Sequence, residues 1–297
     1  MHDAFGQLWS QLFQFEGYGE LLVLVRNSIV AGAVLGLTGG LIGVFVMARD
    51  LAFAVHAISE LSFAGAAAGL LFGIGVVEGS LAGSLAAALL IGVLGSRARN
   101  RNSIIAVLMP FGLGLGILCL SLYSGRAANK FGLLTGQIVA VDNPRLTALL
   151  VICGIVVVAL LLVWRPLMFV SIDAQVAEAR GVPAVALSIV FMVLLGMAVA
   201  VSVQIVGSLL VLSVLVTPAA AALRISASPV LVPVLSCVFA VVSMVGGILL
   251  ALGGSIPISP FVTTLSFLIY VVCRVVGGVR DRRRLPREPR HPAEVAV

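Results

Sequence analysis

Long apolar runs separated by short polar connections dominate this chain of 297 residues. A helix that crosses a bilayer needs roughly 20 mostly apolar residues. Scanning for such runs predicts about nine spanning helices, at residues 21–47, 51–75, 79–95, 104–124, 146–164, 185–203, 205–222, 229–250 and 259–277. The sixth and seventh form one long run that divides at residues 203–207, and a single kinked or unwound helix there would lower the count to eight. We therefore expect an all-α polytopic membrane protein with eight or nine transmembrane helices in a bundle.

The composition agrees with this pattern and excludes a soluble globular protein. Hydrophobic residues make up 61% of the chain and charged residues 10%, against about 45–50% and about 25% in soluble domains. The 32 glycines include the helical spacings Gly32-x3-Gly36-x3-Gly40 and Gly112-x-Gly114-x-Gly116. Because small residues let helix backbones approach closely in lipid, we expect Gly-rich helix packing.

The short basic connections predict the orientation of the chain. Arginines follow the first, third, fifth, seventh and ninth predicted spans, and cytoplasmic connections carry an excess of Lys and Arg. This pattern places the C-terminus in the cytoplasm and the N-terminus outside. The connection at 125–145 disagrees, because it also carries basic residues and falls outside under this count: Arg126, Lys130 and Arg145.

Three regions are expected along the chain. Residues 1–20 resemble an N-terminal interfacial segment with an aromatic anchor and lack the basic start of a cleavable signal peptide. Residues 21–277 form the membrane domain. Residues 278–297 form an Arg-rich cytoplasmic tail that we expect to be disordered. Because much of the net charge of +6 lies in this tail, it indicates a membrane anchor, and we expect lipid contact and no nucleic-acid partner.

A histidine and a carboxylate lie one helical turn apart inside the second apolar run, at His56 and Glu60. A spacing of four places both side chains on one helix face. Ionisable groups are costly inside a bilayer and seldom face lipid, so we favour a functional pair over a structural one. Such a pair could bind a metal ion, relay protons, or satisfy its own hydrogen bonds.

Two further polar residues are candidates for the same environment. Ser59 lies between His56 and Glu60, although serines in spans more often bond back to their own helix. Gln204 lies where the sixth and seventh runs divide, and a glutamine inside a bundle more often bonds a neighbouring helix than lines a pore. We treat both as candidate pore-lining residues.

The connection at residues 171–183 is polar, favours a helix and ends in Gly181 and Pro183, a normal helix stop. On the cytoplasmic side it could dock a soluble partner, and the alternative is an ordinary connecting loop. The sequence contains neither a G-x-x-x-x-G-K-[ST] phosphate loop nor an H-E-x-x-H motif. We therefore expect that the chain is not an enzyme and does not itself bind ATP in that way.

Several stretches resemble the permease subunits of bacterial zinc, manganese and iron ABC importers, the ABC-3 family. The resemblance runs from about residue 20 to residue 275. In the stretch at 55–65, His56 and Glu60 stand where the family motif G-D-x-L-S-H-A-x-x-P-G has its Asp and His, and Ala64 stands at its Pro. Residues 131–141 look like the F-G-D-I-L-A-V loop without its aspartate. Residues 206–211 with 217–220 look like the V-G-x-L-L-V…P-A-A signature.

The resemblance implies a dimeric permease, either a homodimer or a heterodimer, in the bacterial cytoplasmic membrane. ATP would bind a separate cytoplasmic ATPase subunit, and an extracytoplasmic lipoprotein would deliver the metal. The cargo would be a zinc or manganese ion, with no cofactor bound by this chain. His56 and Glu60 would form a transient pore site. The stretch that is similar to the family's ATPase-coupling helix comprises Asp173, Glu178, Ala179, Arg180 and Gly181.

Two alternatives stay open at this point. The first is an ABC permease for a chelated metal or another small solute, in which the pair would be structural. The second is a proton-coupled secondary transporter that uses His56 and Glu60 as a relay.

Overall fold

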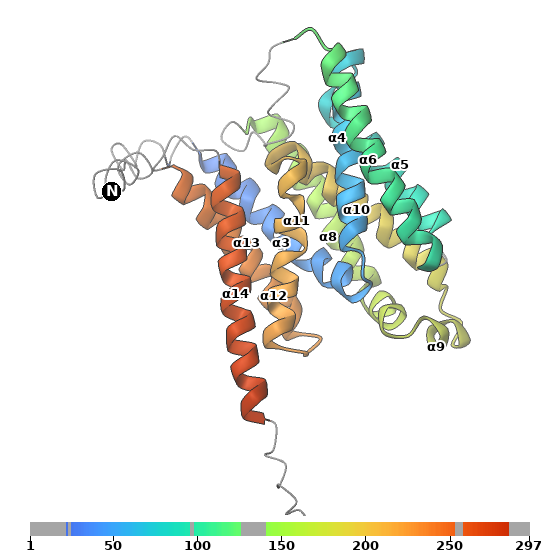
Figure 1. Cartoon of the computed structure of the whole chain (residues 1–297), viewed down its shortest axis with the longest axis vertical. Helices are drawn as coiled ribbons and strands as arrows, with labels where there is room; N and C mark the ends of the chain where they lie inside the picture. The colour runs from blue at the N-terminus through green and yellow to red at the C-terminus, as the bar shows by residue number, and fades with distance from the viewer. Residues whose placement is uncertain (1–21, 23–24, 96–97, 126–140, 253–257, 285–297) are drawn as a thin grey trace, which may run out of the picture.

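The computed structural model describes residue 22 and residues 25–95, 98–125, 141–252 and 258–284. Within these ranges all regular structure is helical, which confirms the all-α prediction (Figure 1). The elements are α3 (Arg26–Ala48), α4 (Ala52–Phe72), α5 (Val76–Leu94), α6 (Ala98–Leu122), α8 (Asn143–Ile172), α9 (Ala174–Ala179), α10 (Ala184–Val206), the 3-10 turn η2 (Ser208–Leu210), α11 (Val211–Leu215), α12 (Thr217–Ile225), α13 (Leu231–Ala251) and α14 (Ile258–Arg284).

In the part of the chain that the structure describes, eight helices are long and apolar enough to cross a membrane: α3, α4, α5, α6, α8, α10, α13 and α14. The seventh predicted span, 205–222, is not a single helix. Gly207 ends α10 with φ of +84° and ψ of 157°, and η2, α11 and α12 follow as short pieces. This backbone conformation is essentially restricted to glycine, which explains why the long apolar run breaks there.

The chain reverses at this break, and α12 returns to the end of the bundle from which α10 started. Val44 near the end of α3, Ala222 in α12 and Val232 in α13 pack into one cluster. The carbonyl oxygen of Arg224 lies directly against Gly277 of α14. We call this the α9 end of the bundle: the end that carries α9 and the C-terminal ends of α3, α12 and α14 (Figure 1).

The starts of α3 and α8 meet at the opposite end. The side-chain amide of Asn27 donates to the carbonyl of Val141 at 3.2 Å and to the side-chain oxygen of Asn143 at 2.8 Å. Arg26 and Arg145 therefore lie at the end away from α9, so the conflict noted for the connection at 125–145 persists in the structure. Most of that connection, including the F-G-x-L-like stretch, lies outside the described residues.

Glycines form the closest helix contacts, as the sequence predicts. A Cβ on Gly36 would lie 2.8 Å from the Cα of Val241, and one on Gly40 would lie 2.6 Å from the Cα of Cys237, both backbone atoms of α13. Gly65 of α4 and Gly79 of α5 abut each other's carbonyl oxygens. Of the second glycine set, Gly112 and Gly116 face α4, whereas Gly114 has nothing within 4 Å.

Two helices continue well past the ends of the predicted apolar runs. Helix α14 continues to Arg284, so residues 278–284 are helical where a disordered tail was expected. Helix α8 runs for 30 residues to Ile172, past Arg165 and Pro166, where the apolar run stops at residue 164. Backbone hydrogen bonding continues where hydropathy stops, and a helix of this length, about 45 Å, exceeds the roughly 30 Å hydrocarbon layer. The interfacial segment at 1–20 lies outside the described residues.

Candidate functional site

His56 and Glu60 lie in the second and third turns of α4, and the structure keeps them on one face as the spacing predicts. His56 Nε2 lies 3.8 Å from Glu60 Oε1. The Glu60 side chain is 4% exposed and that of His56 is 27% exposed. Glu60 lies eight residues beyond Ala52, about 12 Å along the helix axis at about 1.5 Å per residue. A carboxyl group is therefore buried well inside the bundle.

The pair does not satisfy its own hydrogen-bonding groups. A separation of 3.8 Å is too long for a hydrogen bond. His56 Nδ1 and Glu60 Oε2 are both buried without a hydrogen-bond partner. Because buried polar atoms in proteins are nearly always paired, these two orphan atoms need an explanation. A purely structural pair would be expected to close into direct contact, so the geometry favours a site that receives a ligand.

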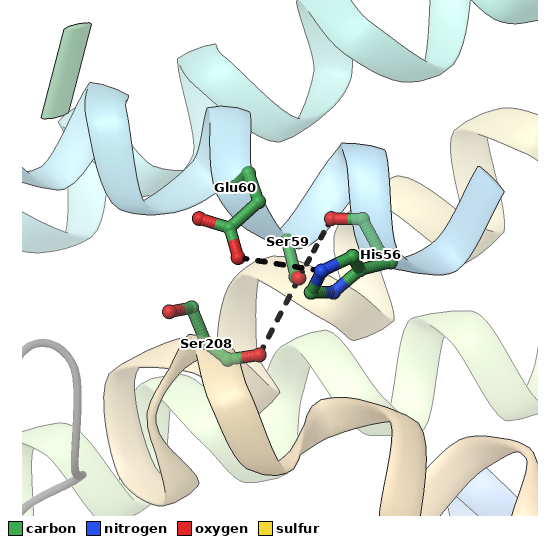
Figure 2. A network of polar contacts seen from close by, with 4 residues as sticks. All are labelled: His56, Ser59, Glu60 and Ser208. Carbon is green, nitrogen blue, oxygen red and sulfur yellow. Dashed lines mark hydrogen bonds and ion pairs between the residues drawn. The ribbon is translucent and has the colours of Figure 1, made fainter. Parts of the chain in front are cut away.

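Ser59 connects this turn of α4 to the break after α10. Its hydroxyl donates to the carbonyl of His56 at 2.8 Å and lies 3.4 Å from the carbonyl oxygen of Ser208. The Ser208 hydroxyl is buried without a hydrogen-bond partner. Figure 2 shows the Ser208 side chain across from the Glu60 carboxylate, with Ser59 and the His56 ring beside them. Ser59 and Ser208, which are 149 positions apart in the sequence, thus lie together in one polar spot inside the bundle.

The break itself adds negative character to this spot. The last carbonyl groups of a helix lack intrahelical partners, and its C-terminus carries a partial negative charge of roughly half a unit. Helix α10 ends at Val206, and the turn η2 that follows packs against α4. In membrane transporters, interrupted helices place such carbonyl ends at cation sites.

Gln204 lies in the last turn of α10, two residues before that helix ends. Its side-chain amide nitrogen is buried without a hydrogen-bond partner. Among the described residues, no hydrogen bond joins Gln204 to His56, Ser59 or Glu60. The structure therefore places it near the break, and its part in lining a pore stays a prediction.

These groups offer one imidazole nitrogen, one carboxylate and one hydroxyl, a set of N and O donors that suits a divalent transition metal ion. Within the described residues there is no group of three or more His, Cys, Asp and Glu side chains that could enclose a metal. Two strong side-chain ligands are fewer than the four of a structural zinc site and would hold an ion more weakly.

The predicted coupling segment forms a shorter helix than expected. Helix α9 has six residues, and Asp173 caps its start by accepting from the backbone N–H of Val176 at 3.0 Å. Gly181 follows with φ of +81° and stops it. Ala177 packs against Val170 and Ala184. All five predicted coupling residues are exposed: Asp173, Glu178, Ala179, Arg180 and Gly181. Because the Asp173 cap separates α9 from α8, the segment cannot form one helix over 171–183.

Replacing Gly207 with alanine is expected to destabilise the protein by about 1–3 kcal/mol, because the side chain would occupy a backbone region that only glycine adopts readily. Thermal unfolding of the purified variant in detergent measures the change. Gly114→Ala is the matched control, since its Cβ meets nothing within 4 Å. An unchanged midpoint for Gly207→Ala would mean that the break does not need this conformation.

The sequence pointed to the α4 pair and to polar residues near Gln204, but not to the placement of Ser208 opposite that pair. A signal was present, because a glycine divides two apolar runs and a hydroxyl residue follows it directly. With the geometry in place, a comparison with known families assigns the chain. The model of the ABC 3 transport family matches residues 22–277. The chain belongs to the ABC 3 transport family.

Several relatives of this ABC 3 transport chain carry descriptive names. The manganese transport system membrane protein MntC of Halalkalibacterium halodurans is 28% identical over 225 residues, covering 75% of this chain and 77% of MntC. The manganese import system permease protein ScaB of Streptococcus pneumoniae is 29% identical over 205 residues, covering 67% of this chain and 70% of ScaB.

The solved structure of PsaBC from Streptococcus pneumoniae in complex with Fab aligns with a TM-score of 0.78 at 22% identity. The alignment covers 86% of this chain and 94% of that one. At this identity the match shows the fold, and it confirms the helical arrangement described above. The V-G-x-L-L-V-like stretch of this ABC 3 transport chain is the segment that breaks at Gly207.

Proposed function

We propose that this chain is the membrane-spanning permease subunit of an ABC importer that moves a divalent transition metal ion, zinc or manganese, across the bacterial cytoplasmic membrane. The observation that carries the proposal is the buried His56–Glu60 pair facing the Gly207 break, in a chain of a transport family. Relatives named for manganese transport support manganese as a cargo.

The donor set explains how the site could hold an ion briefly and release it. His56 and Glu60 would each supply one ligand from α4, while the Ser208 hydroxyl and the carbonyl end of α10 would face the ion from the other side. Two strong side-chain ligands are fewer than a closed zinc site uses, so water or a second subunit would complete the coordination. In a permease dimer, a second His56 and Glu60 could approach the first.

Energy would come from a separate ATPase subunit that docks on α9. The exposed surface of α9 and the residue after it combines the charged residues Glu178 and Arg180 with the apolar side chain of Val176, which is 45% exposed. Such a mixed surface is typical of a protein contact. An extracytoplasmic metal-binding lipoprotein would deliver the ion at the opposite end of the bundle.

The distribution of basic residues supports a cytoplasmic location for the α9 end. Arg49, Arg101 and Arg224 lie there, and the C-terminal end of α14 leads to the Arg-rich tail on the same side. Arg26 and Arg145 lie at the opposite end. They reduce the excess of basic residues at the α9 end without reversing it. The C-terminus would thus be cytoplasmic.

Replacing Val176 with aspartate is expected to weaken ATPase binding about 10–30-fold, because a charge would enter an apolar contact worth roughly 1.4–2 kcal/mol. Co-purification with the ATPase and titration of the ATPase into permease-containing nanodiscs measure the loss. Ile74→Asp is the matched control. Ile74 is also an exposed apolar residue, but it follows the C-terminal end of α4, which points away from the α9 end of the bundle. Equal affinity for both variants would contradict docking on α9.

Reconstitution of this chain with an ABC ATPase subunit tests the function as a whole. We expect uptake of manganese or zinc into proteoliposomes that requires ATP, and stimulation of ATP hydrolysis by the free ion. Stimulation only by a chelated metal would instead favour a chelate permease. Transport driven by a proton gradient without the ATPase would favour a secondary transporter.

A further inference from the structure

A cavity of about 240 Å³ opens at the α9 end, where the ends of several membrane helices and α9 meet. Its charged and hydroxyl lining comes from Arg49 after α3, Arg101 in α6, Glu178 in α9 and Ser188 in α10. Apolar side chains line the rest, among them Leu51 and Met192. The cavity is separate from the His56–Glu60 site and includes neither residue.

Two guanidinium groups gather at this cavity. The side chain of Arg101 donates to the backbone carbonyl of Arg49 at 3.4 Å. That of Arg49 donates to the Ser188 hydroxyl at 2.9 Å and lies 5.5 Å from the ring centroid of Phe191. These contacts hold both arginines in place against helices α6 and α10. The site is therefore ordered by contacts within the chain.

The positive charge at the cavity has no counter-ion among the described side chains. The only ion pair in the described part of the chain is His56–Glu60, so neither Arg49 nor Arg101 is paired. Arg101 Nε is buried without a hydrogen-bond partner. Burial, together with the nearby charge of Arg101, lowers the pKa of the Arg49 guanidinium.

The carboxylate of Glu178 also lines the cavity, and among the described residues it forms no ion pair with either arginine. Asp50, beside Arg49 in the chain, is exposed and makes no ion pair among the described residues. An anion with several acceptor oxygens would reduce the repulsion between the arginines and could accept from Arg101 Nε. Phosphate groups match guanidinium donors in this way.

The surroundings of the cavity suit an amphiphile. Val185 at the start of α10 lines the cavity and is 56% exposed. Val93 and Leu94, which lie between the lining residues Gly92 and Gly95 at the end of α5, are 56% and 55% exposed. In a membrane protein, such a surface next to a basic pocket suits acyl chains beside a headgroup. Basic pockets between transmembrane helices on the cytoplasmic side bind anionic lipid headgroups.

We infer that Arg49 and Arg101 form a binding site for the phosphate group of an anionic phospholipid, with Ser188 as the hydroxyl that orients Arg49. The site lies between the proposed ATPase-docking helix and the start of the helix that carries His56. A lipid bound there would tie α3, α6 and α10 together at the α9 end. The inference does not depend on which cargo the chain transports.

Lipid titration of the purified full-length chain in detergent tests the site. Added phosphatidylglycerol is expected to raise the thermal unfolding midpoint by several degrees, whereas phosphatidylcholine with the same acyl chains is not. Arg101→Gln should remove the rise, and Arg101→Lys should retain much of it. Arg26→Gln, an exposed arginine at the other end of α3, is the matched control and should keep the full rise.

Two further arms make the outcome decisive. Adding inorganic phosphate at constant ionic strength distinguishes a lipid headgroup from a free anion. If phosphate alone raised the unfolding midpoint, and Arg101→Gln removed that rise, the site would bind a free anion. Glu178→Gln should lower the phosphatidylglycerol concentration needed for half the effect, which keeps the test open if Arg101→Gln does not fold. The inference would be overturned by equal effects of both lipids, or by a rise that persists in Arg101→Gln.

Discussion

Replacing both His56 and Glu60 with alanine is expected to reduce ATP-driven uptake of zinc or manganese at least about 100-fold, while the complex with the ATPase still assembles. Loss of residues that merely support metal ligands already costs about 10–100-fold in metal affinity or activity, so loss of the ligands themselves should cost at least as much. Uptake of the metal into proteoliposomes containing permease and ATPase measures the effect.

The double variant should fold, because both ionisable groups leave together. Removing one partner of a buried pair leaves an uncompensated charge, which is strongly destabilising, whereas removing both can be neutral or stabilising. The single variant Glu60→Gln keeps the shape and separates charge from packing. Glu78→Gln is the matched control, since Glu78 is an exposed carboxylate in the first turn of α5. Full uptake by the double variant would remove His56 and Glu60 from the transport path.

Replacing Gly40 with valine is expected to destabilise the protein by about 3 kcal/mol or more and to lower the yield of folded protein. A Cβ at this position would lie 2.6 Å from the Cα and 2.8 Å from the backbone nitrogen of Cys237. Backbone atoms of a packed helix cannot move aside as a flexible side chain can. The Gly40 carbonyl also accepts a 2.7 Å hydrogen bond from the Ser236 hydroxyl, which forced separation of α3 and α13 would break.

Thermal unfolding followed by circular dichroism in detergent measures this loss. Gly114→Val in α6 makes the same chemical change where a Cβ meets nothing within 4 Å, and it should unfold close to the wild-type temperature. If both valine variants unfolded at the same temperature as wild type, close α3–α13 packing would not limit stability. The effect should be larger than that of Gly207→Ala, because a clash between two backbones cannot relax locally.

The length of the apolar runs explains why the spans were predictable. Eight of the nine predicted runs correspond to long helices, since apolar length is a sufficient signal for a spanning helix. Helix ends were less predictable. Helix α8 continues through Arg165 and Pro166, and α14 continues to Arg284, because intrahelical hydrogen bonds do not depend on hydropathy. The cap at Asp173 separates the end of α8 from the start of α9 within residues 171–183, and it likewise depends on backbone geometry.

The sequence by itself determined the membrane class, the run of helices and the placement of His56 and Glu60 on one face, because all three follow from local spacing. It also carried the family motifs. Only the tertiary structure decided that Ser208, directly after the Gly207 break, lies opposite Glu60 and that Arg49 and Arg101 meet at one cavity. Such meetings join residues far apart in the chain. These contacts depend on how closely the glycine-lined helices pack and on where the chain reverses direction. The spacing of residues along one helix does not encode either property.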